Sequence, residues 1–171
     1  SPASVVITNL DASLEYVNPR FTEVTGYSAA EVLGQNPRIL QSGITPKDTY
    51  LNMWDTLTHG RPWKGELVNR RKNGELYWEE AQIAPVKDAA GTVTHYVAVK
   101  SDINARKQLE SQNEEALLRL QKIASRVPGV VYQYLLRADG SSCFPFASEA
   151  IREIYRVTPE EVREDASRVF S

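Results

Sequence analysis

The single cysteine of this 171-residue chain, Cys143, has no partner for an internal disulfide. A chain without disulfides is typical of a reducing compartment such as the cytoplasm. The sequence also lacks any apolar run of the roughly 18 to 20 residues that a membrane-spanning helix needs. No basic segment precedes the apolar residues near its start, as it would in a signal peptide. We therefore expect a cytoplasmic protein segment that does not insert into a membrane.

Neither sign of charge dominates, because 20 Lys and Arg residues stand against 22 Asp and Glu residues, for a net charge of −2. Such a chain has no broad attraction for the phosphates of nucleic acid or for anionic lipid, so neither is expected as a partner. Histidine is also scarce. His59 and His95 are expected at the surface, whereas haem needs an axial ligand aimed into a pocket. A haem site is therefore not expected.

Residue sets typical of catalysis are missing as well. The sequence has no recognisable combination of nucleophile, base and orienting residue, no cluster of metal ligands and no phosphate loop of the G-x-x-x-x-G-K type. The short basic run from Arg70 to Lys72 adjoins a predicted turn, and solvation accounts for it. We predict that the chain is not itself an enzyme.

The first part of the chain alternates between strand and helix signals. β-Branched residues at Val5–Thr8 and a second short run at Leu14–Val17 are separated by Asn, Asp and Ser, which predicts a β-hairpin. The segment Asn18–Gly26 begins with a capping Asn-Pro pair and ends at a glycine, as short helices do. Ser28 and Glu31 form a capping box that opens another short helix.

Longer elements follow. Residues 45–60 are predicted to form an amphipathic helix, because apolar residues recur at helical spacing; these are Tyr50, Met53, Trp54 and Leu57. Beyond residue 62 the period becomes two, which predicts strands at 63–70, 76–86 and 93–101. An Asn-Gly turn joins the first two. The fold class is therefore α+β, with a five-stranded antiparallel sheet flanked by short helices.

Residues 102–126 are polar and contain neither glycine nor proline, which predicts one long helix. Leu109, Ala116 and Ile123 are seven residues apart, and Leu120 adds part of a second seam. This is coiled-coil spacing and favours a parallel homodimer. The alternative is an amphipathic helix that folds back on its own domain, since Gln112 and Asn113 weaken the seam.

The last 45 residues repeat the start of the chain at an offset of 130. Phe21-Thr22-Glu23-Val24 aligns with Ile151-Arg152-Glu153-Ile154, and the capping box at Ser28 aligns with one at Thr158. Arg156 falls at the position of the helix-ending Gly26, where glycine tolerates a positive φ and arginine does not. We expect either a different turn or a strained residue there.

These segments carry motifs that occur together in one family, and the chain resembles PAS sensor domains. The motifs are Asn18-Pro19-Arg20-Phe21, Thr25-Gly26-Tyr27, Glu31-Val32-Leu33-Gly34, Arg71-Lys72-Asn73-Gly74, Tyr77-Trp78, Ala84-Pro85-Val86 and Ser101-Asp102-Ile103. The resemblance implies a PAS sensor domain at residues 1–103, a coiled-coil linker helix at 104–126 and the N-terminal part of a second PAS domain at 127–171.

Within that family, the segment Pro62–Lys72 is similar to FAD-binding PAS domains of bacterial redox sensors. The resemblance implies that Asn69 hydrogen-bonds the pyrimidine edge of the flavin and that Trp63 flanks it near the pocket mouth. It also implies ring or phosphate contacts for Asn36, Arg38 and Gln41, with Trp54 on the neighbouring helix. FAD is the expected cofactor and FMN the alternative. From the residues alone, the alternatives are that Asn69 is satisfied by backbone and that Trp63 is ordinary core.

The light-sensing flavin branch of the family has a cysteine where this chain has Pro37, so a flavin–thiol adduct at that position is excluded. That branch also places an asparagine and a glutamine where this chain has Glu79 and Lys100. These two share an inward-facing parity on strands expected to pair, so they either form a buried ion pair or remain solvated at strand ends. Glu80 would take the acidic role if the register slipped by one residue.

The sequence therefore predicts the sensory input region of a bacterial signalling protein that detects redox state or oxygen through a non-covalently bound flavin. Lys100 lies two residues before Asp102 and Ile103, where the last strand meets the long helix, so a change at the cofactor is expected to pass through this junction. The expected partners are a second copy of the chain and an output domain, either a histidine kinase or a cyclic-dinucleotide enzyme. The alternative is a cofactor-free PAS module for dimerisation or for binding a small metabolite.

Overall fold

A computed structural model describes residues 2–170 of the chain. The chain forms two compact units, Ser1–Gln108 and Leu109–Ser171. Each is described by itself below.

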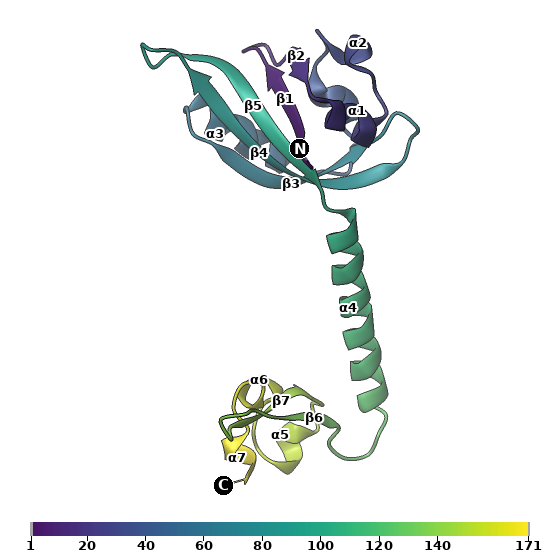
Figure 1. Ribbon diagram of the computed structural model, residues 1–171. Coiled ribbons are helices and arrows are strands. Elements are labelled where there is room, and N and C mark those ends of the chain that lie inside the picture. Colours follow the sequence, from purple (N-terminus) through teal and green to yellow (C-terminus); the bar gives the residue numbers. More distant parts are fainter. Residues whose placement is uncertain (1, 171) are drawn as a thin grey trace. The chain divides into compact units, whose positions relative to one another are not determined.

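Unit 1 is built on a five-stranded antiparallel sheet in the order β2-β1-β5-β4-β3, which confirms the predicted fold (Figure 1). Its strands are β1 (Ser4–Thr8), β2 (Leu14–Val17), β3 (Trp63–Arg70), β4 (Leu76–Lys87) and β5 (Val93–Asp102). β1 and β2 come from the start of the chain, and β5 returns from far along the sequence to pair with β1. The central position of β5 therefore closes the domain.

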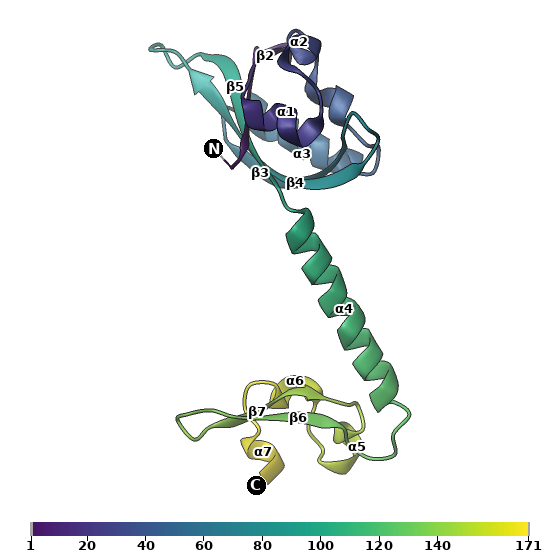
Figure 2. The same cartoon turned by 45° about the vertical axis from the view of Figure 1, so that its right-hand side comes forward.

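Short helices cover one side of this sheet, namely α1 (Pro19–Thr25), α2 (Ala29–Val32) and α3 (Lys47–Thr58), together with the 3₁₀ helix η1 (Pro37–Leu40) (Figure 2). Asn18 caps α1, since its Oδ1 accepts the Phe21 N–H at 3.1 Å. The predicted capping box of Ser28 and Glu31 is present at the start of α2. Their local chemistry thus starts these helices where the sequence places them.

The space between sheet and helices holds two apolar clusters. One joins β1, β2 and β5 to α1 and η1 through Val6, Leu14, Phe21, Leu40 and other buried side chains. The other joins α3 to β3 and β4 and contains Met53, Leu57, Trp63, Leu67 and Ala81. The indole of Trp63 lies over Gly65, where an added Cβ would come within 2.3 Å of the ring, so this strand position requires glycine.

The long helix α4 (Asn104–Ala124) begins directly after β5. Its first turn is bound to the outer face of the sheet, where Arg106 pairs with Glu66 at 2.6 Å and the Lys107 ammonium lies 4.8 Å from the centre of the Trp78 ring. From Gln108 to Ile123 every residue is exposed. No helix among residues 2–170 is both long and apolar enough to cross a membrane.

Unit 2 contains the hairpin β6 (Tyr132–Leu136) and β7 (Ser142–Ala147), followed by the short helices α5 (Ile151–Ile154), α6 (Pro159–Val162) and α7 (Ser167–Phe170). Their core includes Phe144, Ile151, Val157 and Val162. The predicted capping box is present, with Thr158 and Glu161 in the roles of Ser28 and Glu31. The assignment of residues 127–171 to a second PAS domain stays a prediction.

Arg156 has a φ of 57°, and Gly26 at the equivalent position has a φ of 79°. The second copy therefore keeps the left-handed turn and places a residue with a Cβ in it. Such a conformation costs an L-residue about 1–2 kcal/mol. Of the two outcomes expected from the sequence, the strained residue is the one observed.

Candidate functional site

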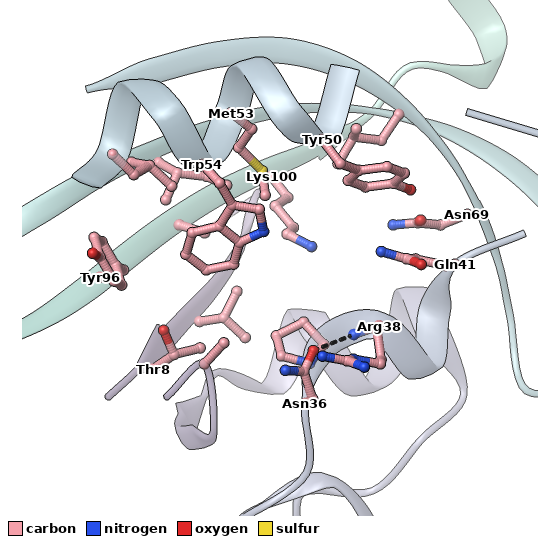
Figure 3. Close-up of a pocket in the computed structure, with 17 residues that line it drawn as sticks. Thr8, Asn36, Arg38, Gln41, Tyr50, Met53, Trp54, Asn69, Tyr96 and Lys100 are labelled. Atoms are coloured by element: carbon pink, nitrogen blue, oxygen red, sulfur yellow. Dashed lines mark hydrogen bonds between the residues drawn. The ribbon is translucent and has the colours of Figure 1, made fainter. Parts of the chain in front are cut away.

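A cavity of about 240 Å³ lies between the sheet and the segment from η1 to α3. Its walls are mainly apolar, and side chains from β1, β3, β4, β5, η1 and α3 contribute to them. The lining residues are Val6, Thr8, Ala12, Asn36, Pro37, Arg38, Gln41, Tyr50, Met53, Trp54, Leu57, Leu67, Asn69, Ile83, Tyr96, Ala98 and Lys100 (Figure 3). An apolar chamber with a few polar groups is the usual form of a small-molecule site.

Three polar side chains gather at one end of the cavity, those of Gln41, Tyr50 and Asn69 (Figure 3). Gln41 and Asn69 are held together by an isolated backbone bridge between η1's exit and β3. Thr45 strengthens this attachment, because its Oγ1 accepts the Val68 N–H at 2.9 Å. The Tyr50 hydroxyl oxygen is buried and has no hydrogen-bond partner among the described residues. A buried hydroxyl without a partner costs about 1–3 kcal/mol, so a ligand or water is needed there.

Asn69 is 3% exposed and is joined to a buried ion pair. Its Nδ2 donates to Glu79 Oε1 at 2.8 Å, and the Lys100 ammonium lies 3.0 Å from the same oxygen. Nδ2 ties the amide to the ion pair, and Oδ1 is the atom of Asn69 that can accept a further hydrogen bond. The ammonium of Lys100 points into the cavity (Figure 3). The buried ion pair expected from strand parity is therefore present, with its charges adjacent to the cavity.

Tyr77 lies next to this polar group. It is the cross-strand partner of Asn69, its side chain is 1% exposed, and its hydroxyl oxygen has no hydrogen-bond partner of acceptable geometry among the described residues. Burial, and after it the negative charge of Glu79, raises the pKa of the Tyr77 phenol well above its ordinary value. Tyr77 is therefore a neutral phenol whose energy depends on the charge of Glu79.

The rim of the cavity is formed by η1. Asn36 caps this 3₁₀ helix, since its Oδ1 accepts the Arg38 N–H at 3.0 Å, and Pro37 occupies the first helical position. The Arg38 side chain is exposed at the rim, where a guanidinium suits an anionic group such as phosphate. At the opposite end from Asn69, Trp54 and Tyr96 form an edge-to-face pair with ring centres 5.9 Å apart (Figure 3).

Six of the eight predicted site residues line the cavity, namely Asn36, Arg38, Gln41, Trp54, Asn69 and Lys100. Glu79 lies behind Asn69 and Lys100 and reaches the cavity only through them. Trp63 lies in the core beside α3, where its Nε1 donates to Asn52 Oδ1 at 3.0 Å. Trp63 is on the inner face of β3, as predicted, but the cavity extends under only part of this face and does not reach Trp63.

Sequence reasoning missed Tyr50, which it counted only as part of the apolar face of a helix. A tyrosine among aliphatic positions on such a face is the signal that could have identified it, because a buried phenol needs a partner for its hydroxyl. Neither histidine lines the cavity: His59 is exposed at the end of α3, and His95 pairs with Glu15 at 3.0 Å. Within residues 2–170 no group of three or more potential metal ligands comes together.

The junction of β5 and α4 lies close to the buried ion pair. Asp102 is the cross-strand partner of Glu79 and two residues after Lys100. Its Oδ1 accepts the Asn104 N–H at 3.0 Å, which caps α4. The buried Ile103 donates its N–H to the Trp78 carbonyl at 3.0 Å. Both predicted junction residues therefore fix the start of α4 to the sheet.

Comparison with known proteins adds to this geometry. The sequence profile of the PAS domain family matches residues 2–105. The nitrogen fixation regulatory protein of Klebsiella oxytoca is 37% identical over 128 residues, which cover 75% of this chain and 26% of that protein. The aerotaxis receptor of Escherichia coli strain K12 is 34% identical over 94 residues, 55% of this chain and 18% of that receptor. The chain thus spans about a quarter or less of the length of these relatives.

Solved structures agree on the fold. The LOV domain of a blue-light-activated histidine kinase from Erythrobacter litoralis is 26% identical and superimposes with a TM-score of 0.57, over 61% of this chain and 98% of that one. By name, the proteins compared are thus a regulatory protein, a receptor and a light-activated histidine kinase.

Proposed function

The chain belongs to the PAS domain family, and from that premise we propose that it is the cytoplasmic input region of a bacterial sensor that binds FAD non-covalently and responds to redox state or oxygen. The observation that supports this proposal is the cavity itself, an apolar chamber with an unpaired phenol and two amide groups at one end and an ammonium group pointing into it. These groups match a planar apolar ring system with one polar edge.

The residues fit a flavin in the following way. Asn69 Oδ1 would accept from the imide N–H of the ring, while Gln41 and the Tyr50 hydroxyl would meet its carbonyl oxygens. Met53, Leu57, Leu67 and Ile83 would enclose the apolar part of the ring system. The cavity of about 240 Å³ is small for a whole dinucleotide, so the phosphates would lie at the rim beside Arg38. FAD rather than FMN is proposed on the resemblance of Pro62–Lys72 to FAD-binding domains.

A flavin, when bound, supplies a ring that takes up electrons and protons and so changes its charge and hydrogen bonding. The Glu79–Lys100 pair is buried, with side chains 4% and 9% exposed, so water screens it little. A charge change in the cavity would therefore alter the balance between Asn69, Glu79 and Lys100. The junction at Asp102 and Ile103 would pass that change to α4 and to an output domain, a histidine kinase or a cyclic-dinucleotide enzyme.

The test is flavin content. We expect the purified chain, or the chain after incubation with FAD, to show flavin absorption, and chromatography of the released cofactor to identify FAD. Asn69→Leu should weaken flavin binding at least about tenfold, because a polar edge would then face a methyl group. Tyr50→Phe should weaken it less. Gln121→Leu, which also replaces a side-chain amide by leucine on exposed α4, is the matched control and should retain wild-type flavin content.

A chain that stays colourless with both FAD and FMN would contradict the proposal and favour the cofactor-free module. The stimulus is tested by hydrogen exchange at residues 103–108 of the loaded chain. Chemical reduction in the dark should change exchange there. If illumination of the oxidised form produces the change and dark reduction does not, the stimulus is light instead.

We propose further that α4 pairs with α4 of a second copy. Leu109, Asn113, Ala116, Leu120 and Ile123 follow alternating spacings of four and three residues, and all five are exposed in the single chain. An isolated helix of this length is marginal in water, so a partner is needed to cover the stripe. Asn113 within the seam favours two strands in register.

Leu120→Glu should convert a dimer to a monomer in sedimentation or light-scattering measurements. Leu118→Glu, the same change on an exposed leucine outside the stripe, is the control. A wild-type chain that is monomeric at high concentration would contradict this part of the proposal without affecting the flavin site.

A further inference from the structure

Arg71 lies outside the cavity, yet besides its neighbour Glu75, whose Oε2 is 3.6 Å from Nε, its guanidinium contacts three other elements of unit 1. Nη1 donates to the Val24 carbonyl in the last turn of α1, and Nη2 donates to Asp102 Oδ2 at 2.7 Å. Its Cζ lies 4.3 Å from the centre of the Tyr77 ring. The side chain is only 17% exposed, so this arginine is packed between α1, β4 and the end of β5.

On one side, Arg71 is connected through Tyr77 to the polar group behind the cavity, which Glu79, Asn69 and Lys100 form. Tyr77 connects Arg71 to this group, because Arg71 is stacked on its ring while Glu79 and Asn69 act on its hydroxyl. Tyr77 is also the cross-strand partner of Asn69. The negative charge of Glu79 and the positive charge of Arg71 affect the pKa of this phenol in opposite directions. A change at the Glu79 carboxylate would thus act on Arg71 through the phenol on which Arg71 is stacked.

On the other side, Arg71 holds Asp102, the last residue of β5, whose carboxylate binds the first amide of α4. Arg71 binds one carboxylate oxygen of Asp102, and the other accepts the Asn104 N–H. Asn104 in turn accepts the Trp78 N–H at 2.7 Å through its Oδ1. A movement of Arg71 would thus change the orientation of the capping carboxylate, and with it the stability of the first turn of α4.

We propose that Arg71 is a positioning residue that couples the Glu79–Lys100–Asn69 group at the cavity to the start of α4. For its stimulus this rests on the proposed function, but the contacts are properties of the chain and can be tested without a cofactor. Lysine would not replace arginine here. A planar guanidinium can stack on Tyr77 and donate to two acceptors at once. An ammonium is a point charge and lacks this planar arrangement of N–H donors.

The experiment is a double-mutant cycle read by hydrogen exchange at the amides of residues 103–108 in the full chain. Glu79→Gln removes the negative charge of the buried pair with little change of shape, leaves the Lys100 ammonium without its anion, and stands in for a change of state in the cavity. We expect it to alter exchange at these amides by about threefold, a size at which coupling between contacting residues becomes measurable. In the Arg71→Gln background the same substitution should have less than half that effect.

Arg71→Gln alone should speed exchange in the first turn of α4 by about tenfold, since a charge-assisted bond to the cap is lost. Arg70→Gln is the matched control, because this neighbouring arginine donates to the Ser42 carbonyl instead, and it should leave residues 103–108 unchanged. Arg71→Lys keeps the charge and should behave as Arg71→Gln does. If Arg71→Gln does not fold, the cycle is run with Arg71→Lys.

The proposal is overturned if Glu79→Gln leaves residues 103–108 unaffected in the wild-type background, or if its effect is the same with and without Arg71. It is also overturned if Arg71→Lys retains full coupling. Flavin content, measured on the same proteins, separates the two proposals. Arg71→Gln should retain the flavin. If no protein binds flavin, the proposed cofactor is contradicted, and the double-mutant cycle alone decides on Arg71.

Discussion

The first thirty or so residues of unit 1 and residues 131–163 of unit 2 use the same local chemistry in two different settings. In unit 1 the Val5 N–H donates to Asn18 Oδ1 at 2.9 Å, and Asn18 N–H returns a bond to the Val5 carbonyl. In unit 2 the Val131 N–H donates to Ser148 Oγ at 3.0 Å, and Ser148 N–H bonds the Val131 carbonyl. The same two hydrogen bonds thus join the hairpin to the helix start in both.

The two regions differ in what covers them. β1 is paired on both sides, with β2 and with β5. The equivalent strand β6 is paired only with β7 among the described residues, and all five of its residues are exposed. The comparison shows that local capping and turn chemistry is sufficient to set the elements, whereas burial and a polar interior depend on strands contributed by distant sequence.

The largest expected change in stability concerns the buried ion pair of unit 1, Glu79 in β4 and Lys100 in β5. Lys100→Met leaves the Glu79 charge buried without its cation and should destabilise unit 1 by about 3–5 kcal/mol. The unfolding of unit 2 should not change. Chemical denaturation followed by circular dichroism checks both.

Lys64→Met is the matched control, because Lys64 pairs with Glu80 at 3.4 Å with its own side chain 61% exposed. Such an exposed pair contributes about 0–1 kcal/mol. If Lys100→Met destabilises unit 1 no more than this control does, the pair does not function as a buried one.

The next largest change in stability is expected at Gly26 and Arg156, the equivalent left-handed positions of the two units. Gly26→Ala should destabilise unit 1 by about 1–2 kcal/mol, because alanine must adopt a left-handed conformation. Arg156→Gly should stabilise unit 2 by up to about 1 kcal/mol, since the relief of strain is partly offset by the backbone entropy of glycine. Thermal unfolding of each variant measures both shifts.

Arg163→Gly serves as the control for unit 2, because Arg163 has an ordinary φ of −62° and glycine should only destabilise that position. If Arg156→Gly destabilises unit 2 as much as Arg163→Gly does, the left-handed residue is not strained.

The smallest effect distinguishes the two capping boxes by pH. A hydrogen bond from Lys72, and then the Ser28 backbone N–H, lowers the pKa of Glu31 to about 2, from an ordinary value of 4.5. A depressed folded-state pKa gives stability that is present above pH 4.5 and is lost as the pH falls towards about 2. For Glu161 the bond from the Thr158 backbone is the main cause of its lowered pKa.

Lys72→Gln should therefore raise the pKa of Glu31 towards its ordinary value and leave that of Glu161 unchanged, as measured by NMR titration of the side-chain carboxyl carbons. A Glu31 pKa that does not respond to this substitution would show that the backbone bond alone is responsible.

Much of the fold could be predicted from the sequence because its signals are local. The hairpins, the capped helices and the coupling of Glu79 to Lys100 follow from spacing and strand parity over a few residues. Arg71 was interpreted as part of a solvated basic run, and this interpretation was wrong. Its partners Val24 and Asp102 are 47 and 31 residues away, so no local pattern reports the contact.

The sequence could predict which residues face the interior of the sheet, but not which of them line the cavity. Strand parity places both Trp63 and Asn69 on the inner face, and only the packing of α3 decides that Trp63 is covered while Asn69 meets the cavity. The role of Tyr50 was not predicted for the same reason, because helical periodicity does not distinguish a position that faces the core from one that faces a cavity.

The positions of the three tryptophans give the protein a built-in set of optical reporters. Trp54 lines the cavity, Trp63 is enclosed in the core, and Trp78 lies under Lys107 where α4 leaves the sheet. Since all three belong to unit 1, intrinsic fluorescence follows that unit without a contribution from the other. Variants that retain one indole at a time would therefore record ligand entry, core loosening and helix release as separate signals, each in real time and without an attached dye.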